Sequence, residues 1–155
     1  MNIYLDTNVY CRPFDNQEQL RIRDETDAFE KILDRVRSGD FLMLTSDILQ
    51  YEISNIFAQR KRSEVERYLL LCKSMIAESD TILRLGIRIR DRCGIQSRDA
   101  LHLAAAIEGR ASYFLTCDDD VTSVSKSTKC AEKIAAEYGC NIKICNPIDF
   151  INSEA

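Results

Sequence analysis

Four acidic side chains stand where a carboxylate can take part in chemistry: Asp6, Glu52, Asp99 and Asp118. Asp6 and Asp118 each follow an apolar run typical of a buried strand, and ligands of open parallel sheets bind at the carboxyl ends of the strands. Glu52 and Asp99 lie within apolar helical patterns and are expected to point inward. Partly buried carboxylates that gather raise each other's pKa unless divalent cations hold them ionised. Their oxygens suit Mg²⁺ or Mn²⁺.

Glu52 carries the strongest physical argument of the four. On a helical wheel of about 100° per residue it lies between Ile48 and Ile56, in the stripe that should face the core. A charge there needs a partner, and no Lys or Arg obviously shares that face. Taken singly, Asp6 and Asp118 are also typical of ordinary turn residues. Asp99, in the first turn of its helix, is also typical of an acid that the helix dipole stabilises. These three gain their weight from order and context.

Two further features leave alternatives open. His102, three residues after Asp99, is either a ligand or proton donor of the acidic site or a buried histidine with satisfied hydrogen bonds. Arg84, Arg88 and Arg92 recur every four residues. They form either a basic ridge for phosphates or the border of a solvated helix.

The elements that must position these side chains follow a β-α-β-α rhythm. Short apolar runs alternate with amphipathic segments, which predicts a parallel sheet covered by helices. The patterns over 65–76 and 82–93 are interpreted as a helical insertion on the sheet, and Asn146-Pro147 as a turn. Strands are predicted at 3–5, 41–44, 113–116 and 142–145, and further helices around 28–36, from Ser46 through 57, from Ser97 to 107, and around 130–135.

Length and composition predict a single domain over 1–155. A chain of 155 residues removes roughly 70% of its unfolded surface from water on folding. Its apolar content of 45% and charged content of 30% are ordinary for a soluble globular protein. No apolar stretch approaches the ~20 residues of a membrane span, and the first residues lack the features of a secretory signal. We therefore expect a cytoplasmic protein that does not enter a membrane.

The seven cysteines are odd in number and scattered, without a C-x-x-C pair. That pattern predicts free thiols in a reducing compartment. A zinc site made from Cys140, Cys145 and His102 would have the wrong spacing and too few ligands. The net charge of −4 argues against nucleic-acid binding by a strong overall positive field, but it is compatible with a nuclease whose metal site is built from acids.

Taken in order, these residues resemble the PIN-domain family, the fold of the VapC-type toxins. The resemblance covers essentially the whole chain, and its four pieces together are more specific than any one. Val121 departs from the pattern, because many relatives place an aromatic residue there. The pieces are Leu5-Asp6-Thr7-Asn8, Glu52 in the helix after the second strand, Asp99-Ala100-Leu101-His102-Leu103-Ala104, and Leu115-Thr116-Cys117-Asp118.

The resemblance implies a three-layer α/β/α fold with a central, mainly parallel sheet. It also implies an acidic site for Mg²⁺ or Mn²⁺, with Asp6, Glu52, Asp99 and Asp118 as ligands and catalytic residues. Small polar side chains of the family typically steady those carboxylates. The supporting positions are Thr7, Asn8, Thr116 and, less directly, Asp120.

The implied activity is metal-dependent hydrolysis of RNA phosphodiester bonds by an endoribonuclease, leaving 5′-phosphate and 3′-hydroxyl ends. As the toxin of a toxin–antitoxin pair, the protein would form a homodimer and bind an antitoxin protein, with the helices around 68–75 and 83–89 as candidate surfaces. The alternatives are a housekeeping RNA-processing nuclease and a catalytically weak scaffold or partner-binding module. An aspartyl phosphatase would place a second acid where Asn8 stands, and the glycines form no phosphate-binding loop.

Overall fold

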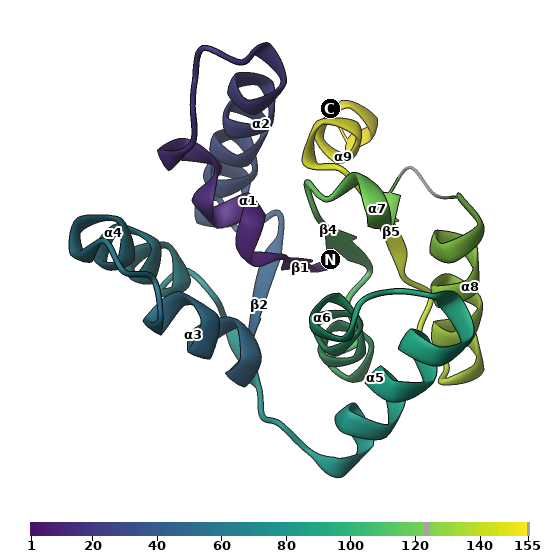
Figure 1. The fold of residues 1–155 in the computed structure, drawn as a ribbon. Coiled ribbons are helices and arrows are strands. Elements are labelled where there is room, and N and C mark those ends of the chain that lie inside the picture. The colour runs from purple at the N-terminus through teal and green to yellow at the C-terminus, as the bar shows by residue number, and fades with distance from the viewer. Residues whose placement is uncertain (123–124, 155) are drawn as a thin grey trace.

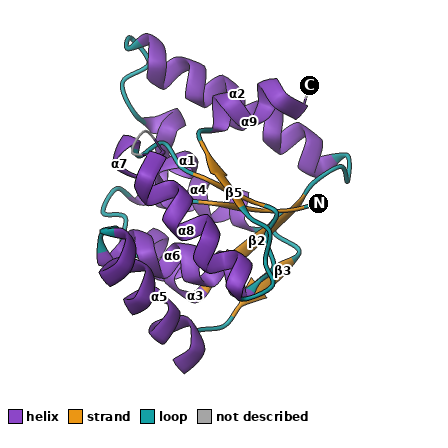
Figure 2. Cartoon of the chain, turned by 90° about the vertical axis from the view of Figure 1, so that its right-hand side faces the viewer, coloured by secondary structure: helices purple, strands orange, loops and turns teal. Residues whose placement is uncertain are grey.

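The fold has three layers, with one parallel sheet between two groups of helices (Figure 1). The computed structural model describes residues 1–122 and 125–154. Helices α2 and α9 cover one face of the sheet, and α5, α6 and α8 cover the other (Figure 2). This arrangement confirms the predicted α/β/α fold.

The sheet has five strands in the order β3-β2-β1-β4-β5, and each neighbouring pair is parallel. The chain therefore enters at the centre and builds outward to both edges. All carboxyl ends of the strands meet at one edge of the sheet, where ligand sites of such sheets form. The strands are β1 (Asn2–Leu5), β2 (Leu42–Ser46), β3 (Ser74–Ile76), β4 (Tyr113–Leu115) and β5 (Lys143–Cys145).

The helices differ widely in length. The longest, α2, presents an apolar stripe that includes Phe29 and Ile32 to the core. Helix α6 is buried over most of its length, as its run of apolar residues predicts. In chain order the helical elements are α1 (Thr7–Cys11), η1 (Arg12–Phe14), α2 (Leu20–Arg37), α3 (Asp47–Ser54), α4 (Gln59–Leu69), α5 (Asp80–Cys93), α6 (Ser97–Glu108), α7 (Asp119–Thr122), α8 (Ser125–Glu137) and α9 (Pro147–Glu154).

The central strand β1 is buried on both faces, since its successive side chains point to opposite sides. Tyr4 stacks on Phe114 with ring centroids 5.5 Å apart and meets His102 of α6 edge to face at 5.8 Å. Ile3 and Leu5 are fully buried as well. A buried tyrosine is thus placed directly beneath helix α6.

The predicted helical insertion over 65–76 is wrong in its second half. Helix α4 ends at Leu69, and Ser74–Ile76 form the edge strand β3, which pairs in parallel with β2 from Leu44 to Ser46. Of these three residues only Ile76 is buried. A segment this short carries no periodicity of its own, so its pairing partner decides its conformation.

The predicted turn at Asn146-Pro147 is in fact the start of helix α9. Asn146 Oδ1 accepts a hydrogen bond from the Ile148 N–H at 2.9 Å. Pro147 occupies the first helical position, where its fixed φ is favourable and its missing N–H costs nothing. The same two residue types suit a turn and a capped helix, and the apolar residues that follow favour the helix.

The expectation that all cysteines are free is wrong for two of them. Cys93 of α5 and Cys130 of α8 form a disulfide across a sequence separation of 37 residues. Helices α5 and α8 pack side by side only after folding, so sequence spacing could not indicate the pairing. The remaining cysteines, Cys11, Cys72, Cys117, Cys140 and Cys145, are free.

Among residues 1–122 and 125–154, no helix has the length and hydropathy that crossing a bilayer requires.

Candidate functional site

Asp6 and Asp118 lie at the carboxyl ends of the adjacent strands β1 and β4. The Asp6 N–H donates to the Leu115 carbonyl at 2.9 Å, which extends the pairing of the two strands. Asp6 is only 1% exposed. Its Oδ1 caps helix α1 by accepting from the Thr7 N–H at 2.7 Å. Its place at the sheet edge is therefore set by both a strand and a helix.

Two small polar side chains hold the second oxygen of Asp6. Thr116 Oγ1 donates to Asp6 Oδ2 at 2.9 Å, and Asn8 Nδ2 lies 3.3 Å from the same oxygen. Asn8 Oδ1 in turn accepts from the Cys117 N–H at 3.0 Å. Thr116 Oγ1 also accepts from the Asp118 N–H at 3.1 Å, so one hydroxyl contacts both ends of the site.

Glu52 reaches the same region from helix α3. Ser46 caps that helix as the sequence predicts, accepting from the Leu49 N–H at 3.2 Å. Glu52 Oε1 accepts from Thr7 Oγ1 at 2.5 Å and from His102 Nε2 at 2.6 Å. Thr7 thus contacts two of the predicted acids, Asp6 through its backbone and Glu52 through its hydroxyl.

Glu52 has a cationic partner, and this partner comes from another helix. Arg98 Nε lies 2.6 Å from Glu52 Oε2. Arg98 belongs to α6, and a helical wheel of α3 cannot show a partner on another helix. Burial opposes ionisation of Glu52, but the hydrogen bonds from His102 and Thr7 and the Arg98 charge outweigh it and hold its pKa below the usual value.

His102 is fully buried and belongs to the site. Its Nδ1 lies 2.7 Å from the Tyr4 hydroxyl, which lies 2.6 Å from Ser46 Oγ. Burial raises the pKa of Tyr4, so the phenol stays protonated. An ionised Glu52 can only accept, so His102 donates through Nε2, and in that tautomer Nδ1 accepts a hydrogen bond from the Tyr4 hydroxyl. His102 is therefore a buried histidine whose two ring nitrogens both have hydrogen-bond partners, and one of those partners is a predicted acid of the site.

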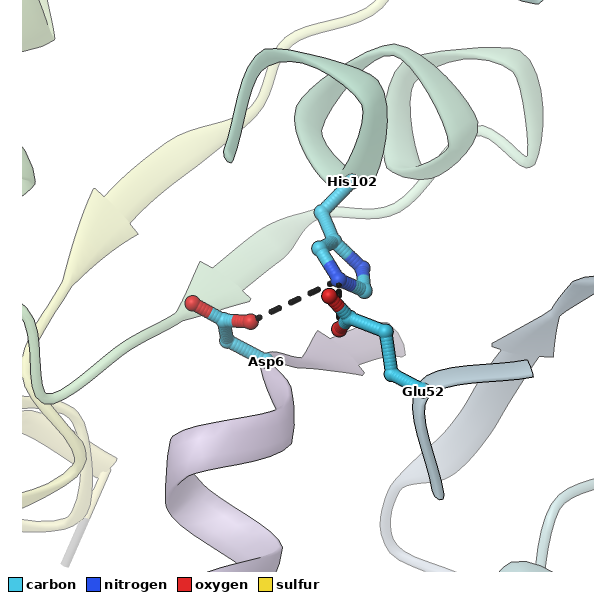
Figure 3. Close-up of side chains that lie close together, drawn as sticks. All are labelled: Asp6, Glu52 and His102. Atoms are coloured by element: carbon cyan, nitrogen blue, oxygen red, sulfur yellow. Dashed lines mark hydrogen bonds and ion pairs between the residues drawn. The ribbon is translucent and has the colours of Figure 1, made fainter. Parts of the chain in front are cut away.

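Asp6, Glu52 and His102 form a close group (Figure 3). Each offers a ligand atom, and the three atoms all lie within 4.8 Å of one another. Asp6 Oδ1 and His102 Nε2 are 3.8 Å apart. Within the described part of the chain, this is the group of ligating side chains close enough to hold one ion.

Asp99 and Asp118 lie beside this group rather than within it. Burial, and then the charges of Asp6 and Asp118, raise the pKa of Asp99 to about 6. Asp118 is half-buried, and its Oδ1 accepts from the Asp120 N–H at 2.9 Å. Asp120 thus contacts Asp118 through its backbone N–H, while its own side chain is exposed. The acids are thus close enough to repel one another.

Sequence reasoning missed a buried acid that supports the Asp118 segment. Glu25 of α2 is fully buried and pairs with Arg12 at 2.9 Å and with Arg21 at 3.5 Å. Arg21 also pairs with Asp119 at 2.5 Å, next to Asp118. Glu25 shares the apolar stripe of α2 with Phe29. An acid within an apolar stripe is the same signal that singled out Glu52, and it would also have identified Glu25.

Two surface features, the predicted arginine ridge and an apolar groove, are candidate sites besides the acidic group. Arg88 pairs with Glu137 and lies over the Tyr138 ring, which fits a solvated helix border better than a free phosphate ridge. A mostly apolar groove of about 540 Å³ lies beside α3 and does not include any of the four acids. The convergence of carboxylates therefore indicates the chemistry better than the groove does. The groove is lined by Ser46, Asp47, Ile48, Tyr51, Ile76, Glu78, Ile82, Leu101 and Ala105.

Comparison with known proteins gives one sequence family and one fold. The family model of the PIN domain matches residues 3–127. A chain in the crystal structure of VapBC2 from Rickettsia felis bound to a DNA fragment from their promoter superposes with a TM-score of 0.57 at 18% identity. The match covers 81% of this chain and 95% of that chain, and at this identity it shows the fold alone. No curated protein matches the sequence.

Proposed function

The chain belongs to the PIN-domain family, and from that premise we propose that it is a metal-dependent endoribonuclease that hydrolyses RNA phosphodiester bonds at the acidic site around Asp6. The observation that carries the proposal is the convergence of acids from separate elements. Asp6 and Glu52 lie with His102 in one group whose ligand atoms are within 4.8 Å of one another, and the charges of Asp6 and Asp118 act on Asp99. Asp99 and Asp118 complete the negative charge. The proposed protein is a single domain over 1–155.

The side chains of the site fit a divalent cation. The raised pKa of Asp99 reflects burial and the charges of Asp6 and Asp118, and this repulsion is what a cation relieves. Carboxylate oxygens are the ligands that suit Mg²⁺ and Mn²⁺. A bound cation lowers the pKa of a water and stabilises the charge that develops on the phosphate. The proposed ligands are Asp6, Glu52, Asp99 and Asp118.

The remaining contribution of the chain is to hold these acids in place. Thr116 and Asn8 contact Asp6, and Thr7 contacts Glu52, so two of the ligands have fixed orientations before substrate arrives. Asp118 is only half-buried. It therefore borders the side of the site that an RNA backbone can approach, whereas Asp6 is covered.

The finer proposal is a toxin that pairs with an antitoxin and forms a homodimer. It is supported by the fold shared with a chain of the VapBC2 complex and by apolar side chains exposed on both candidate surfaces. Leu70 is 83% and Met75 53% exposed, and Leu83 and Ile87 of α5 are 46% and 42% exposed. Leu83 and Ile87 lie four residues apart and so face the same side of α5, and apolar surface that is exposed and contiguous is typical of protein contacts.

The test is cleavage of single-stranded RNA by purified protein with Mg²⁺ or Mn²⁺, with excess EDTA, and after Asp6→Asn. We expect cleavage only with a divalent ion and none in the variant, which keeps a side chain able to cap α1. Asp40→Asn is the control, because Asp40 precedes β2 at the opposite edge of the sheet and is 53% exposed. Unchanged cleavage in EDTA would rule out the metal mechanism.

A further inference from the structure

The two carboxylate oxygens of Glu52 have different kinds of partner. Oε1 accepts hydrogen bonds from Thr7 Oγ1 and from the fully buried His102. Oε2 forms an ion pair with Arg98 at 2.6 Å. The Glu52 side chain is 13% exposed, whereas that of Arg98 is 65% exposed. One oxygen is therefore held by the protein interior, and the other by a side chain that reaches in from solvent.

The Arg98 contact is the weaker of the two. An ion pair with a largely exposed partner contributes little to stability, because water screens it and the long side chain loses conformational freedom. The contacts on Oε1 are buried, and breaking them would leave His102 short of a partner. A cation at Glu52 would therefore compete with Arg98 for Oε2 rather than with the buried partners of Oε1, and its charge would repel the guanidinium.

Arg98 differs from the other arginines around the site in what it pairs with. Arg12 is only 22% exposed and is bound by the buried Glu25 and by Asp15. Arg21 is bound by Glu25 and Asp119. Both are tied to acids that lie outside the proposed ligand set. Arg98 is paired with a proposed ligand, so ion binding acts on it directly.

We propose that Arg98 is an RNA-binding residue of this site, which exchanges Glu52 Oε2 for a phosphate of the substrate when the cation binds. The inference rests on the proposed function and deepens it. Arg98 is the second residue of α6 and precedes Asp99, so a released guanidinium stays beside the acids. Its planar fork of N–H donors matches the oxygens of a phosphate. The pairing with Glu52 keeps this charge at the site until an ion takes its place.

The experiment measures Mn²⁺ binding and RNA binding separately for Arg98→Gln. Calorimetry gives the Mn²⁺ affinity, which we expect to rise severalfold because the competing charge is gone. Fluorescence anisotropy of a labelled single-stranded RNA, with Ca²⁺ in place of Mn²⁺, gives the RNA affinity. We expect that affinity to fall about tenfold, the loss of one charge-assisted contact. Arg98→Lys, which keeps the charge without the fork, should lie between wild type and Arg98→Gln in RNA affinity.

Arg90→Gln is the matched control, since Arg90 is 45% exposed and pairs with its neighbour Asp91 on α5. It should change neither affinity. Circular dichroism checks that each variant is folded. Mn²⁺ affinity that stays the same or falls in Arg98→Gln, or RNA affinity that stays the same, overturns the inference. If wild type cleaves RNA with Mn²⁺ and Asp6→Asn does not, the proposed function stands even when the Arg98 result is negative.

Discussion

His102 Nε2 lies 2.6 Å from Glu52 Oε1, and this hydrogen bond joins helix α6 to helix α3 at the buried side of the acidic site. The opposite nitrogen of the ring contacts the Tyr4 hydroxyl at 2.7 Å, and Tyr4 contacts Ser46 at 2.6 Å. A line of hydrogen bonds thus runs from the cap of α3 through the central strand and α6 back to an acid of α3. Glu52 is oriented by the fold rather than by solvent.

The first prediction concerns this orientation. His102→Ala removes a donor to Glu52 and the partner of the buried Tyr4 hydroxyl. Removing a partner that orients a metal ligand typically lowers metal affinity by about 10–100-fold, so we expect Mn²⁺ affinity to fall within that range. The unpaired buried groups should also lower the free energy of unfolding by about 1–3 kcal/mol. Calorimetry and urea denaturation measure the two effects.

His102→Gln separates orientation from packing, because its Nε2 can still donate to Glu52. It should recover part of the Mn²⁺ affinity lost in His102→Ala. Equal Mn²⁺ affinity in wild type and a folded His102→Ala protein would show that His102 does not position Glu52.

The second prediction is a pH dependence of metal binding. The pKa of Asp99 is raised to about 6 by burial and by Asp6 and Asp118. Below that pH the carboxyl is protonated and a cation must displace the proton, so Mn²⁺ affinity should fall by up to about tenfold per pH unit below 6. Above pH 6 it should level off. Calorimetry between pH 5 and 8, the range that spans this pKa, measures the curve, and Asp99→Asn should flatten it.

The raised pKa of Asp99 also affects the stability of the metal-free protein, which should fall as pH rises, whereas metal affinity should rise. The folded state holds the Asp99 proton to a higher pH than the unfolded chain, whose aspartates have a pKa of about 3.9. Between these two values folding takes up a proton, so the contribution of Asp99 to stability decreases as pH rises from about 4 to 6. Metal-free Asp99→Asn should therefore have a higher Tm than wild type at pH 7. A lower Tm would contradict the repulsion inferred among the acids.

The third prediction concerns Glu25, which is fully buried between Arg12 and Arg21. Asn146 Nδ2 also donates to it at 2.6 Å. Glu25→Gln removes the buried charge that Arg12 and Arg21 share and leaves each guanidinium only its outer acid, Asp15 or Asp119. Breaking such a pair should lower the free energy of unfolding by about 2–4 kcal/mol.

Asp34→Asn is the control for this variant, because Asp34 is 77% exposed and pairs with an exposed arginine. It should change stability by less than about 1 kcal/mol. Urea denaturation compares the two variants. A Glu25→Gln protein as stable as wild type would mean that the buried pairs contribute no net stability.

The fourth prediction concerns the Cys93–Cys130 disulfide between α5 and α8. A cross-link that closes a loop of this size should contribute about 3–4 kcal/mol by restricting the unfolded chain. Dithiothreitol should therefore lower the urea midpoint of wild type. The double variant Cys93→Ala/Cys130→Ala should be less stable than oxidised wild type and should not respond to dithiothreitol. A midpoint of wild type that is the same with and without reductant would argue against the bond.

The sequence predicts best the features that depend on one element alone. Glu52 is conspicuous because its own helix surrounds it with apolar residues, and Ser46 is recognisable as a cap from its place before that helix. Arg98 was missed because its partner is on a different helix. Tyr4 reads as an ordinary core aromatic, and only its neighbours in the fold make it a donor to His102. The segment of β3 was missed for the same reason, because its structure comes from pairing with β2.

The capping of α1 by Asp6 bears on how fast an ion can bind. Asp6 accepts hydrogen bonds from the Thr7 N–H, from Asn8 and from Thr116, so its rotamer is already selected when the chain has folded. Little conformational entropy is left to lose at this ligand during binding. The association rate of the cation should then depend on shedding its water and on the departure of Arg98. Rearrangement of Asp6 should not limit it.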